Sequence, residues 1–303
     1  MAQFMDMCSK KTPRILSIQS HVVSGYVGNK SATFPLQLLG FEVDVINSVQ
    51  LSNHTGYKAF KGQILNDKDL DDIIDCLVEN DLDNYTYLLT GYVGSASFLK
   101  KIAEVVHILK QKNPDLIYVC DPVMGDNGKM YVPEALKEIY IKEIVPLADI
   151  IIPNQFELEL LTNLNINTMS DVQNAVKKLH EIGPETVAVT STELGDKLTA
   201  IFSTIKDSKI IKIDIPKIPI NFTGSGDLFA ALFLAHTHLQ DDMKVAIEKT
   251  VNSLYSVLLA TYNYSQAYQD EESQPARRIE LRLIQSKNLI ENPEIKLFAE
   301  TLS

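Results

Sequence analysis

Short apolar runs alternate with longer stretches of helical periodicity along most of the chain. The runs at residues 85–89, 116–119, 148–152 and 187–190 are continuous and predict strands buried on both faces, as in a parallel sheet. Residues 14–18 and 42–49 predict two further strands. Helical periodicity predicts helices at residues 28–39, 69–79, 95–112, 133–143, 228–239 and 245–262. This alternation predicts an α/β fold, a three-layer αβα sandwich around a mostly parallel central sheet.

The carboxyl-terminal half departs from strict alternation. Residues 197–205 and 209–215 predict an antiparallel pair of strands, placed just before a glycine-rich turn. Residues 269–278 predict a charged, mobile loop, followed by a last ordered element at 280–284. With 45% hydrophobic residues and no linker-like stretch, we expect a single domain over residues 13–303, preceded by a flexible N-terminus at residues 1–12.

Composition and charge narrow the function classes. A formal net charge of −11 argues against a nucleic-acid-binding or anionic-membrane surface. The first residues lack an apolar signal-peptide core, and no apolar run reaches the roughly 20 residues of a membrane span. The three cysteines, Cys8, Cys76 and Cys120, have unrelated spacings and favour reduced thiols, with Cys120 packed in the core. We therefore expect a soluble, intracellular protein of the cytoplasm.

The segment Phe222-Thr223-Gly224-Ser225-Gly226-Asp227 is followed at once by an apolar helical run. Glycines let a phosphate approach backbone N–H groups, and the free amides at a helix start carry about half a positive charge. We expect Asp227 to cap this helix and to point at the anion position, where it could take a proton from an attacking nucleophile. The alternative interpretation is an ordinary tight turn with an aspartate cap.

Polar residues follow several predicted strands, and each also has a purely structural interpretation. Asp121 before Pro122 could simply start a loop. Asn154 could cap a helix over residues 155–161, with Glu157 completing a capping box. Thr190 and Ser191 could be turn residues, and residues 53–57 a surface loop with a solvated histidine.

These structural interpretations leave one feature unexplained. In a parallel sheet Asp121, Glu157 and Asp227 would converge on one edge, beyond the carboxyl ends of the strands. Carboxylates held together repel one another, and cations that coordinate oxygen relieve that cost. The chain also lacks a G-x-x-x-x-G-K-[ST] loop, which excludes a P-loop kinase, so phosphate must be held by the glycine turn, metals and backbone amides.

The motifs at these positions resemble those of the pyridoxal kinases of the ribokinase-like superfamily, from residue 15 to about residue 295. The glycine turn alone indicates only the superfamily. Two segments narrow the resemblance from the superfamily to the pyridoxal kinases: Ser17-Ile18-Gln19-Ser20-His21 and Asn53-His54-Thr55-Gly56-Tyr57. It is extended by Leu89-Thr90-Gly91-Tyr92, Cys120-Asp121-Pro122 and Pro153-Asn154-Gln155-Phe156-Glu157.

The resemblance implies an ATP-dependent kinase that phosphorylates the 5′-hydroxymethyl group of pyridoxal, pyridoxine and pyridoxamine. Asp227 would deprotonate this hydroxyl, and the amides of Gly224, Ser225 and Gly226 would form the anion hole. The vitamin would contact Ser20, Val27, Leu51, Thr55, Tyr92 and Asp227.

The resemblance also implies an ATP site with Mg²⁺ or another divalent cation and a monovalent cation, K⁺ or Na⁺. The ATP-binding residues would be Asp121, Asp126, Tyr131, Asn154, Glu157, Thr190, Ser191, Ile218, Ile220 and Ser225. Asp121, Asp126, Glu157 and Thr190 would serve the metals. Tyr131 would belong to a lid over the nucleotide, and Ile218 and Ile220 would flank the adenine.

Two departures from the family pattern bear on these assignments. Ile152 stands where the family has a threonine near the monovalent cation, and the segment at residues 125–131 is shorter than in mammalian-type members. Relatives of this kind are homodimers, which we expect here too. The alternatives are a superfamily kinase acting on hydroxymethylpyrimidine or a sugar, and a non-catalytic sensor of B6 vitamers.

Overall fold

The structure, a computed structural model, describes residues 12–194, 197–206, 209–268 and 274–302. Ten strands within this part of the chain form one sheet in the order β12-β11-β10-β9-β8-β5-β4-β1-β2-β3. Six neighbouring strands are parallel and make its centre: β9 (Thr186–Leu194), β8 (Ile150–Ile151), β5 (Ile117–Cys120), β4 (Tyr87–Thr90), β1 (Arg14–Val22) and β2 (Glu42–Leu51). The predicted mostly parallel α/β sheet is confirmed.

Antiparallel strands extend the sheet at both sides. β10 (Lys197–Thr204) pairs with β9 and with β11 (Lys209–Ile215), as the sequence predicts, and β12 (Glu300–Leu302) adds to β11. At the other side β3 (Gly62–Ile64) pairs with β2. The short strands β3 and β12 were not predicted, because neither has enough residues to show a period.

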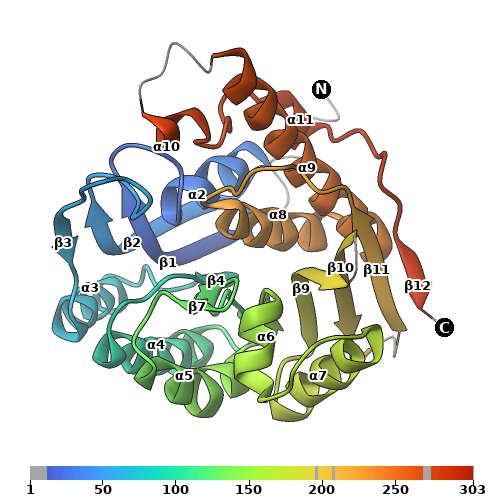
Figure 1. Cartoon of the computed structure of the whole chain (residues 1–303). Helices are drawn as coiled ribbons and strands as arrows, with labels where there is room; N and C mark the ends of the chain where they lie inside the picture. The colour runs from blue at the N-terminus through green and yellow to red at the C-terminus, as the bar shows by residue number, and fades with distance from the viewer. Residues whose placement is uncertain (1–11, 195–196, 207–208, 269–273, 303) are drawn as a thin grey trace, which may run out of the picture.

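Helices cover both faces of the sheet (Figure 1). One layer holds α2 (Asn29–Leu38), α8 (Ser225–Leu239) and α9 (Met243–Ala267), with α10 (Pro275–Arg278) and α11 (Lys287–Glu291) beside them. The other holds α3 (Asp67–Glu79), α4 (Ala96–Lys112), α5 (Ala135–Ile139), α6 (Gln155–Thr162) and α7 (Met169–Ile182). The predicted three-layer αβα arrangement is therefore confirmed.

Alternate residues of the central strands feed two separate cores. On β1, Leu16 and Ile18 pack into the core beneath α3, α4 and α7, whereas Ile15 packs into the core shared with α2, α8 and α9. On β5, Cys120 belongs to the first core and Val119 to the second. Cys120 is fully buried, so the prediction of a packed core thiol is confirmed.

Three predicted elements differ from the structure. The helix expected at 133–143 is short, because α5 gives way to a π-helical turn at Tyr140–Ile144 and a 3₁₀ turn at Val145–Leu147, where Pro146 cannot continue a helix. Of the loop expected at 269–278, residues 269–273 lie outside the described residues, and residues 275–278 form α10, which starts at Pro275. Residues 280–284, expected as an ordered element, form neither helix nor strand.

Helix α7 is absent from our predictions although its start carries a signal. Thr168 accepts a hydrogen bond from the amide of Asp171, and the Asp171 side chain accepts one from the amide of Thr168. This capping box fixes the helix start. The flexible terminus expected at 1–12 falls on residues 1–11, together with Cys8, outside the described residues.

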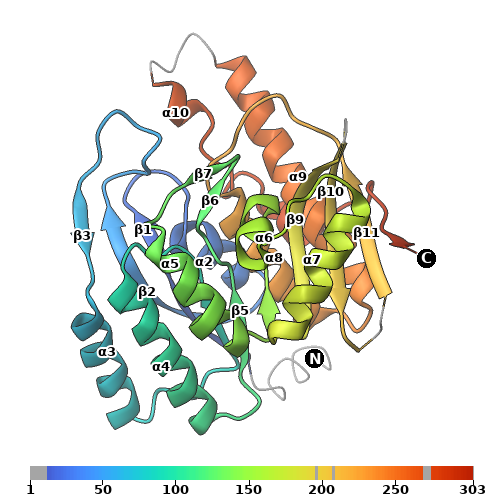
Figure 2. The same cartoon turned by 60° about the horizontal axis from the view of Figure 1, so that its bottom comes forward.

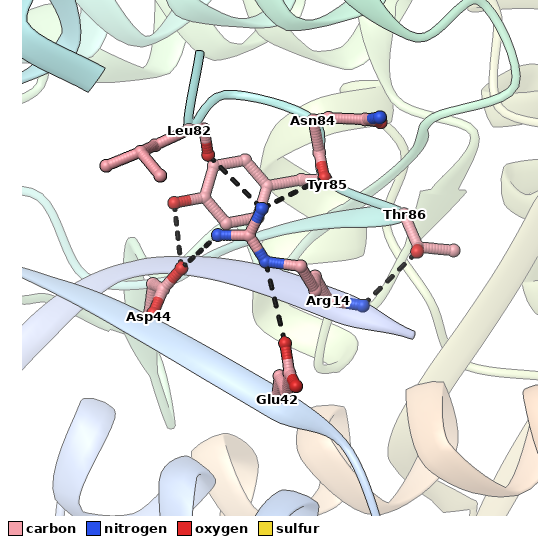
Figure 3. A network of polar contacts seen from close by, with 7 residues as sticks. All are labelled: Arg14, Glu42, Asp44, Leu82, Asn84, Tyr85 and Thr86. Atoms are coloured by element: carbon pink, nitrogen blue, oxygen red, sulfur yellow. Dashed lines mark hydrogen bonds and ion pairs between the residues drawn. The ribbon is translucent and has the colours of Figure 1, made fainter. Parts of the chain in front are cut away.

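The amino ends of the central strands are joined by a dense polar network (Figure 3). The Arg14 guanidinium lies 2.9 Å from the carboxylate of Asp44 and donates to the carbonyls of Leu82 and Asn84. It also stacks on the ring of Tyr85, whose hydroxyl donates to Asp44. Strands β1, β2 and the segment before β4 are thus bound together at this edge.

None of the helices within the described ranges combines the length and apolarity that crossing a membrane would require.

Candidate functional site

The opposite edge of the sheet is formed by the carboxyl ends of the parallel strands (Figures 1 and 2). Several of the predicted site residues lie at the ends of these strands or directly after them. Ser20 lies near the end of β1 and Leu51 ends β2. Tyr92 and Asp121 follow β4 and β5, and Asn154 follows β8. Because neighbouring parallel strands end at the same edge, these side chains are brought to one rim, as expected for ligand sites in open α/β sheets.

A local irregularity lies at Ser20. The pairing of β1 with β2 changes register between Gln19, opposite Asn47, and His21, opposite Gln50. Such bulges redirect side chains next to ligand sites. Beneath it the buried side-chain amide of Asn29, the first residue of α2, donates to the Ile46 carbonyl and the Asn47 side chain on β2, at 3.0 and 2.9 Å. It also donates to the Gln19 carbonyl on β1 at 3.3 Å, and so ties α2 to both strands.

Asp227 lies in the first turn of α8 but does not cap it. The residue at the cap position is Gly224, with φ of 84° and no side-chain cap. The expectation that Asp227 caps the helix is therefore wrong. Its Oδ2 instead accepts a hydrogen bond of 2.8 Å from the backbone amide of Gly28, at the start of α2. Burial raises the pKa of Asp227, and the Gly28 hydrogen bond opposes that rise.

Close backbone contacts explain both glycines of this pair of segments. A Cβ on Gly28, whose φ is 54°, would lie 2.0 Å from the carbonyl oxygen of Ser20. A Cβ on Gly224 would lie 2.1 Å from the carbonyl oxygen of Tyr26. Only glycine fits at either place. Gly28 therefore contacts Ser20 on one side and Asp227 on the other, and the glycine turn packs against the neighbouring Tyr26.

Asp121 stands on the other side of the glycine turn. A Cβ on Gly226 would be 3.9 Å from Asp121 Oδ2, so the aspartate faces the exposed backbone of this turn. Burial raises the pKa of Asp121 well above its usual range, and the charges of Glu157 and Asp227 raise it further. The expected convergence of three carboxylates is confirmed.

Glu157 and Asn154 form the capping box that the sequence predicts. Asn154 accepts from the Glu157 amide at 2.9 Å, and Glu157 Oε2 accepts from the Asn154 amide at 3.0 Å. Glu157 Oε1 also accepts from the amides of Met124 and Gly125. Burial nevertheless raises the pKa of Glu157 to about 8, against the lowering effect of these amides.

The predicted lid is a hairpin of β6 (Gly125–Asp126) and β7 (Lys129–Met130). Asn154 Nδ2 donates to the Gly125 carbonyl at 2.8 Å, so the helix cap also anchors the base of this hairpin. Tyr131 follows β7 and is 54% exposed, which leaves its ring available to a ligand. Asp126 is exposed as well and accepts hydrogen bonds only from Asn127 among the described residues.

The carboxylates at this edge could bind a divalent cation only together with oxygen atoms from a bound substrate, such as phosphate oxygens. Across the described ranges, no group of three His, Cys, Asp or Glu side chains could by itself hold a metal ion. Asp121 and Glu157 are nevertheless two buried carboxylates whose pKa values are raised by burial, and the charge of Glu157 raises the pKa of Asp121 further. Mg²⁺ is usually bound by one or two carboxylates together with substrate phosphates, and this pair suits that kind of site.

The residues predicted to contact the vitamin lie on neighbouring segments. Val27, in the segment between β1 and α2, is buried. Tyr92 is half-buried, and its backbone carbonyl accepts a hydrogen bond of 2.8 Å from Ser48 Oγ. Thr55 is exposed, in the loop after β2. The neighbouring His54, however, is buried and faces Glu280, so the interpretation of a solvated histidine is wrong.

The residues predicted along ATP lie farther along the same edge. Thr190 and Ser191 belong to β9 and are not turn residues, and the Thr190 amide donates to the Pro153 carbonyl at 3.0 Å. Ile218 and Ile220 are half-buried in the connection between β11 and α8. Ile152 is 1% exposed and packs into the core under α8, so its side chain offers no oxygen to a cation.

Two groups at this edge, the Gly28 amide and the Glu280 carboxylate, were not predicted from the sequence. The Gly28 amide was missed because a backbone donor leaves no side-chain signature. Glu280 was missed because its partners are more than 200 positions away.

Comparisons with known proteins identify the family of this chain. A sequence model of a family described as phosphomethylpyrimidine kinase matches residues 37–270. The chain is 51% identical to a pyridoxal kinase of Arabidopsis thaliana, covering 96% of both chains, and 47% identical to that of Homo sapiens, covering 95% of this chain and 98% of the relative. A solved pyridoxal kinase from Leishmania donovani, in complex with ADP and pyridoxamine, is 34% identical with a TM-score of 0.88, covering 96% of this chain and 99% of that one.

The chain belongs to the pyridoxal kinase family. This membership and the ribokinase-like arrangement expected from the motifs are confirmed over nearly the whole length. Pyridoxal kinases phosphorylate an alcohol, and the carboxylate, glycine turn and acidic pair on this edge are the groups from which such a reaction can be built.

Proposed function

We propose that this chain is an ATP-dependent pyridoxal kinase, which converts pyridoxal, pyridoxine and pyridoxamine to their 5′-phosphates in vitamin B6 salvage. Its high identity to named pyridoxal kinases supports this substrate class. So does the complex of the Leishmania relative with ADP and pyridoxamine.

The observation that carries the proposal is the position of Asp227. Its carboxylate accepts a hydrogen bond from the Gly28 amide, and Gly28 packs directly against Ser20. Asp227 itself lies in the first turn of α8, the helix that starts at the glycine turn. A base between an alcohol-binding segment and a cluster of phosphate-binding amides is what phosphoryl transfer to an alcohol needs. Burial raises its pKa, which strengthens it as a base.

In the proposed reaction Asp227 takes the proton of the 5′-hydroxyl as the alcohol oxygen attacks the γ-phosphorus of ATP. The new O–P bond forms while the bond from the γ-phosphorus to the β,γ-bridging oxygen breaks, and ADP leaves with that oxygen. The amides of Gly224, Ser225 and Gly226 stabilise the negative charge on the transferring group. We assign Ser20, Val27, Leu51, Thr55 and Tyr92 to the vitamin.

We assign the nucleotide to the other half of the rim. Asn154, Thr190, Ser191 and Ser225 would lie along the phosphates, Tyr131 would close over them, and Ile218 and Ile220 would flank the adenine. Asp121 and Glu157, with Asp126 at the periphery, would hold Mg²⁺, and Thr190 would lie where a monovalent cation binds. This ion supplies charge neutralisation at the phosphates when it is bound.

Three finer points are part of the proposal. With Ile152 in place of a threonine, we expect a weak dependence on K⁺ or Na⁺. We also propose a homodimer that acts in the cytoplasm, where the exposed free thiol of Cys76 would stay reduced. Light scattering at micromolar concentration tests the dimer, and subcellular fractionation tests the location.

The decisive experiment incubates the purified protein with Mg-ATP and pyridoxal, and follows pyridoxal 5′-phosphate and ADP by chromatography. We expect both products in equal amounts. Failure to form the phosphate, while a known pyridoxal kinase succeeds in the same assay, would overturn the proposal.

The match to the phosphomethylpyrimidine kinase family supports one alternative substrate, hydroxymethylpyrimidine. A panel of pyridoxal, hydroxymethylpyrimidine and a sugar compares kcat/KM directly. We expect pyridoxal to lead the panel.

A further inference from the structure

Glu280 is a buried carboxylate in the segment after α10, outside the groups that the proposed reaction uses. Its side chain is 12% exposed. Figures 1 and 2 both show α10, immediately before it, beside the loop that follows β2. Glu280 therefore reaches from the last part of the chain to the part of the rim assigned to the vitamin.

One oxygen of Glu280 holds the segment between β1 and α2. Oε2 accepts a hydrogen bond of 3.0 Å from the Tyr26 amide. Gly25 has φ of 96°, and a Cβ there would lie 2.2 Å from Glu280 Oε1, so the carboxylate sits directly on this backbone. The carbonyl of the same residue, Tyr26, faces Gly224.

The other oxygen holds the loop after β2. Oε1 accepts from the Tyr57 hydroxyl at 2.9 Å and lies 3.2 Å from His54 Nε2. His54 Nδ1 accepts from the Gly56 amide at 3.1 Å, so in the neutral ring Nε2 carries the proton and donates to Glu280. The peptide of Thr55 is thereby enclosed between two residues whose positions depend on the carboxylate.

The charge of Glu280 is maintained in this place. Burial raises its pKa, but the hydrogen bonds from His54, the Tyr26 amide and Tyr57 outweigh burial, and the pKa is lowered overall. A carboxylate accepts from all these donors at once, whereas a neutral amide has one oxygen and one donor group.

We propose that Glu280 is a positioning residue for the alcohol substrate, which sets residues 25–28 and 54–57 in the single arrangement that lets Val27 and Thr55 grip the vitamin. This inference rests on the proposed function for the identity of the substrate. Glu280 is also linked to the base Asp227 through the chain. It holds the Tyr26 amide, and Gly28, two residues later, donates the hydrogen bond that orients Asp227.

The test compares E280Q with the wild type and with E294Q, whose glutamate is 75% exposed and pairs only with the nearby Lys296 in the described structure. In E280Q, placing the amide oxygen toward Tyr57 and His54 turns its NH₂ against the Tyr26 amide. We expect the KM for pyridoxal to rise about 10- to 100-fold, as for a lost charged hydrogen bond, and the KM for ATP to change less than about 3-fold. E294Q should match the wild type.

A purely structural role would give a lower Tm and less active protein with an unchanged KM for pyridoxal, and that result would overturn the inference. Should E280Q not fold, Y57F removes one of the hydrogen bonds and should raise the same KM about 3- to 10-fold. An unchanged KM in the folded Y57F protein would count equally against the inference.

Hydrogen–deuterium exchange separates this inference from the proposed function, since it needs no substrate. E280Q should exchange faster than the wild type over residues 22–28 and 53–58, with residues 124–132 unaffected. Unaltered exchange in both segments would refute the positioning role even if pyridoxal is the substrate. Absence of pyridoxal phosphorylation in the wild type would refute the proposed function and leave the exchange result to decide the role of Glu280.

Discussion

The two edges of the central sheet satisfy their charges in opposite ways. At the amino edge, Arg14 is matched by Asp44, by backbone carbonyls and by the face of Tyr85 (Figure 3). At the carboxyl edge, Asp121, Glu157 and Asp227 lie together, and each has its pKa raised by burial. The first edge stabilises the fold, whereas the second holds carboxyl groups whose ionisation is costly, and a cation bound with the substrate would lower that cost.

The sharpest way to break this comparison is to neutralise the base. D227N keeps the shape of the side chain and removes its ability to take a proton. We expect kcat to fall about 10²- to 10⁴-fold, because general-base catalysis is lost, and the Tm to stay the same or rise, because a buried charge is removed. Steady-state kinetics and thermal unfolding measure the two effects. A D227N enzyme that turns over as fast as the wild type would exclude Asp227 as the base.

At the amino edge we expect the reverse. R14M keeps the apolar stem of the side chain but loses its hydrogen bonds to the Leu82 and Asn84 carbonyls and its pairing with Asp44. The free energy of unfolding should fall by about 1–2 kcal/mol, with kcat/KM unchanged. Urea unfolding measures this change. The control is K142M, which removes an exposed pair with Glu138 and should cost less than about 0.5 kcal/mol. Equal losses in the two variants would contradict the assignment of this edge to stability.

The raised pKa of Glu157 predicts that the carboxyl edge makes the free energy of unfolding depend on pH. A carboxyl group with a pKa of about 8 in the folded protein binds a proton more tightly there than in the unfolded chain. Its contribution to stability is therefore complete below the usual glutamate pKa and is lost as pH rises through about 8. Without ligands, the free energy of unfolding should fall by several kcal/mol, at most about 5, between these limits.

E157Q removes the titrating group and should flatten this dependence, whatever its effect on absolute stability. Denaturant unfolding at a series of pH values measures both slopes. Mg-ATP should flatten the wild-type slope too, since it stabilises the charged carboxylate. Identical slopes for E157Q and the wild type would show that Glu157 is already ionised in the free protein.

The smallest expected effect concerns the support of the glycine turn. Ser31 on α2 is buried, and its Oγ donates to the Gly224 carbonyl at 3.1 Å. S31A should lower the free energy of unfolding by about 0.5–1.5 kcal/mol, as for one hydrogen bond, and raise the KM for ATP only slightly. Chemical unfolding and ATP kinetics measure these changes. A large fall in kcat would instead show that the turn depends on α2 for its catalytic shape.

The order of the central strands and of most long helices could be predicted because it depends on local periodicity. The site could be predicted in outline because residues after parallel strands must meet at one edge, which places Asp121 and Asn154 together. The partner of Asp227 could not be predicted, since the Gly28 amide lies 199 residues away and is a backbone group. Glu280 escaped for the same reason, and its segment has no regular structure to mark it.

The contact between Glu280 and Tyr26 joins residues 254 positions apart. Strand β1, which provides Ser20, is synthesised well before Glu280. A growing chain can therefore assemble most of its sheet while the loops beside Ser20 still lack the acid that organises them. Catalytic competence would be acquired only after Glu280 has been synthesised, and a polypeptide terminated before it could retain most of the sheet without holding its substrate.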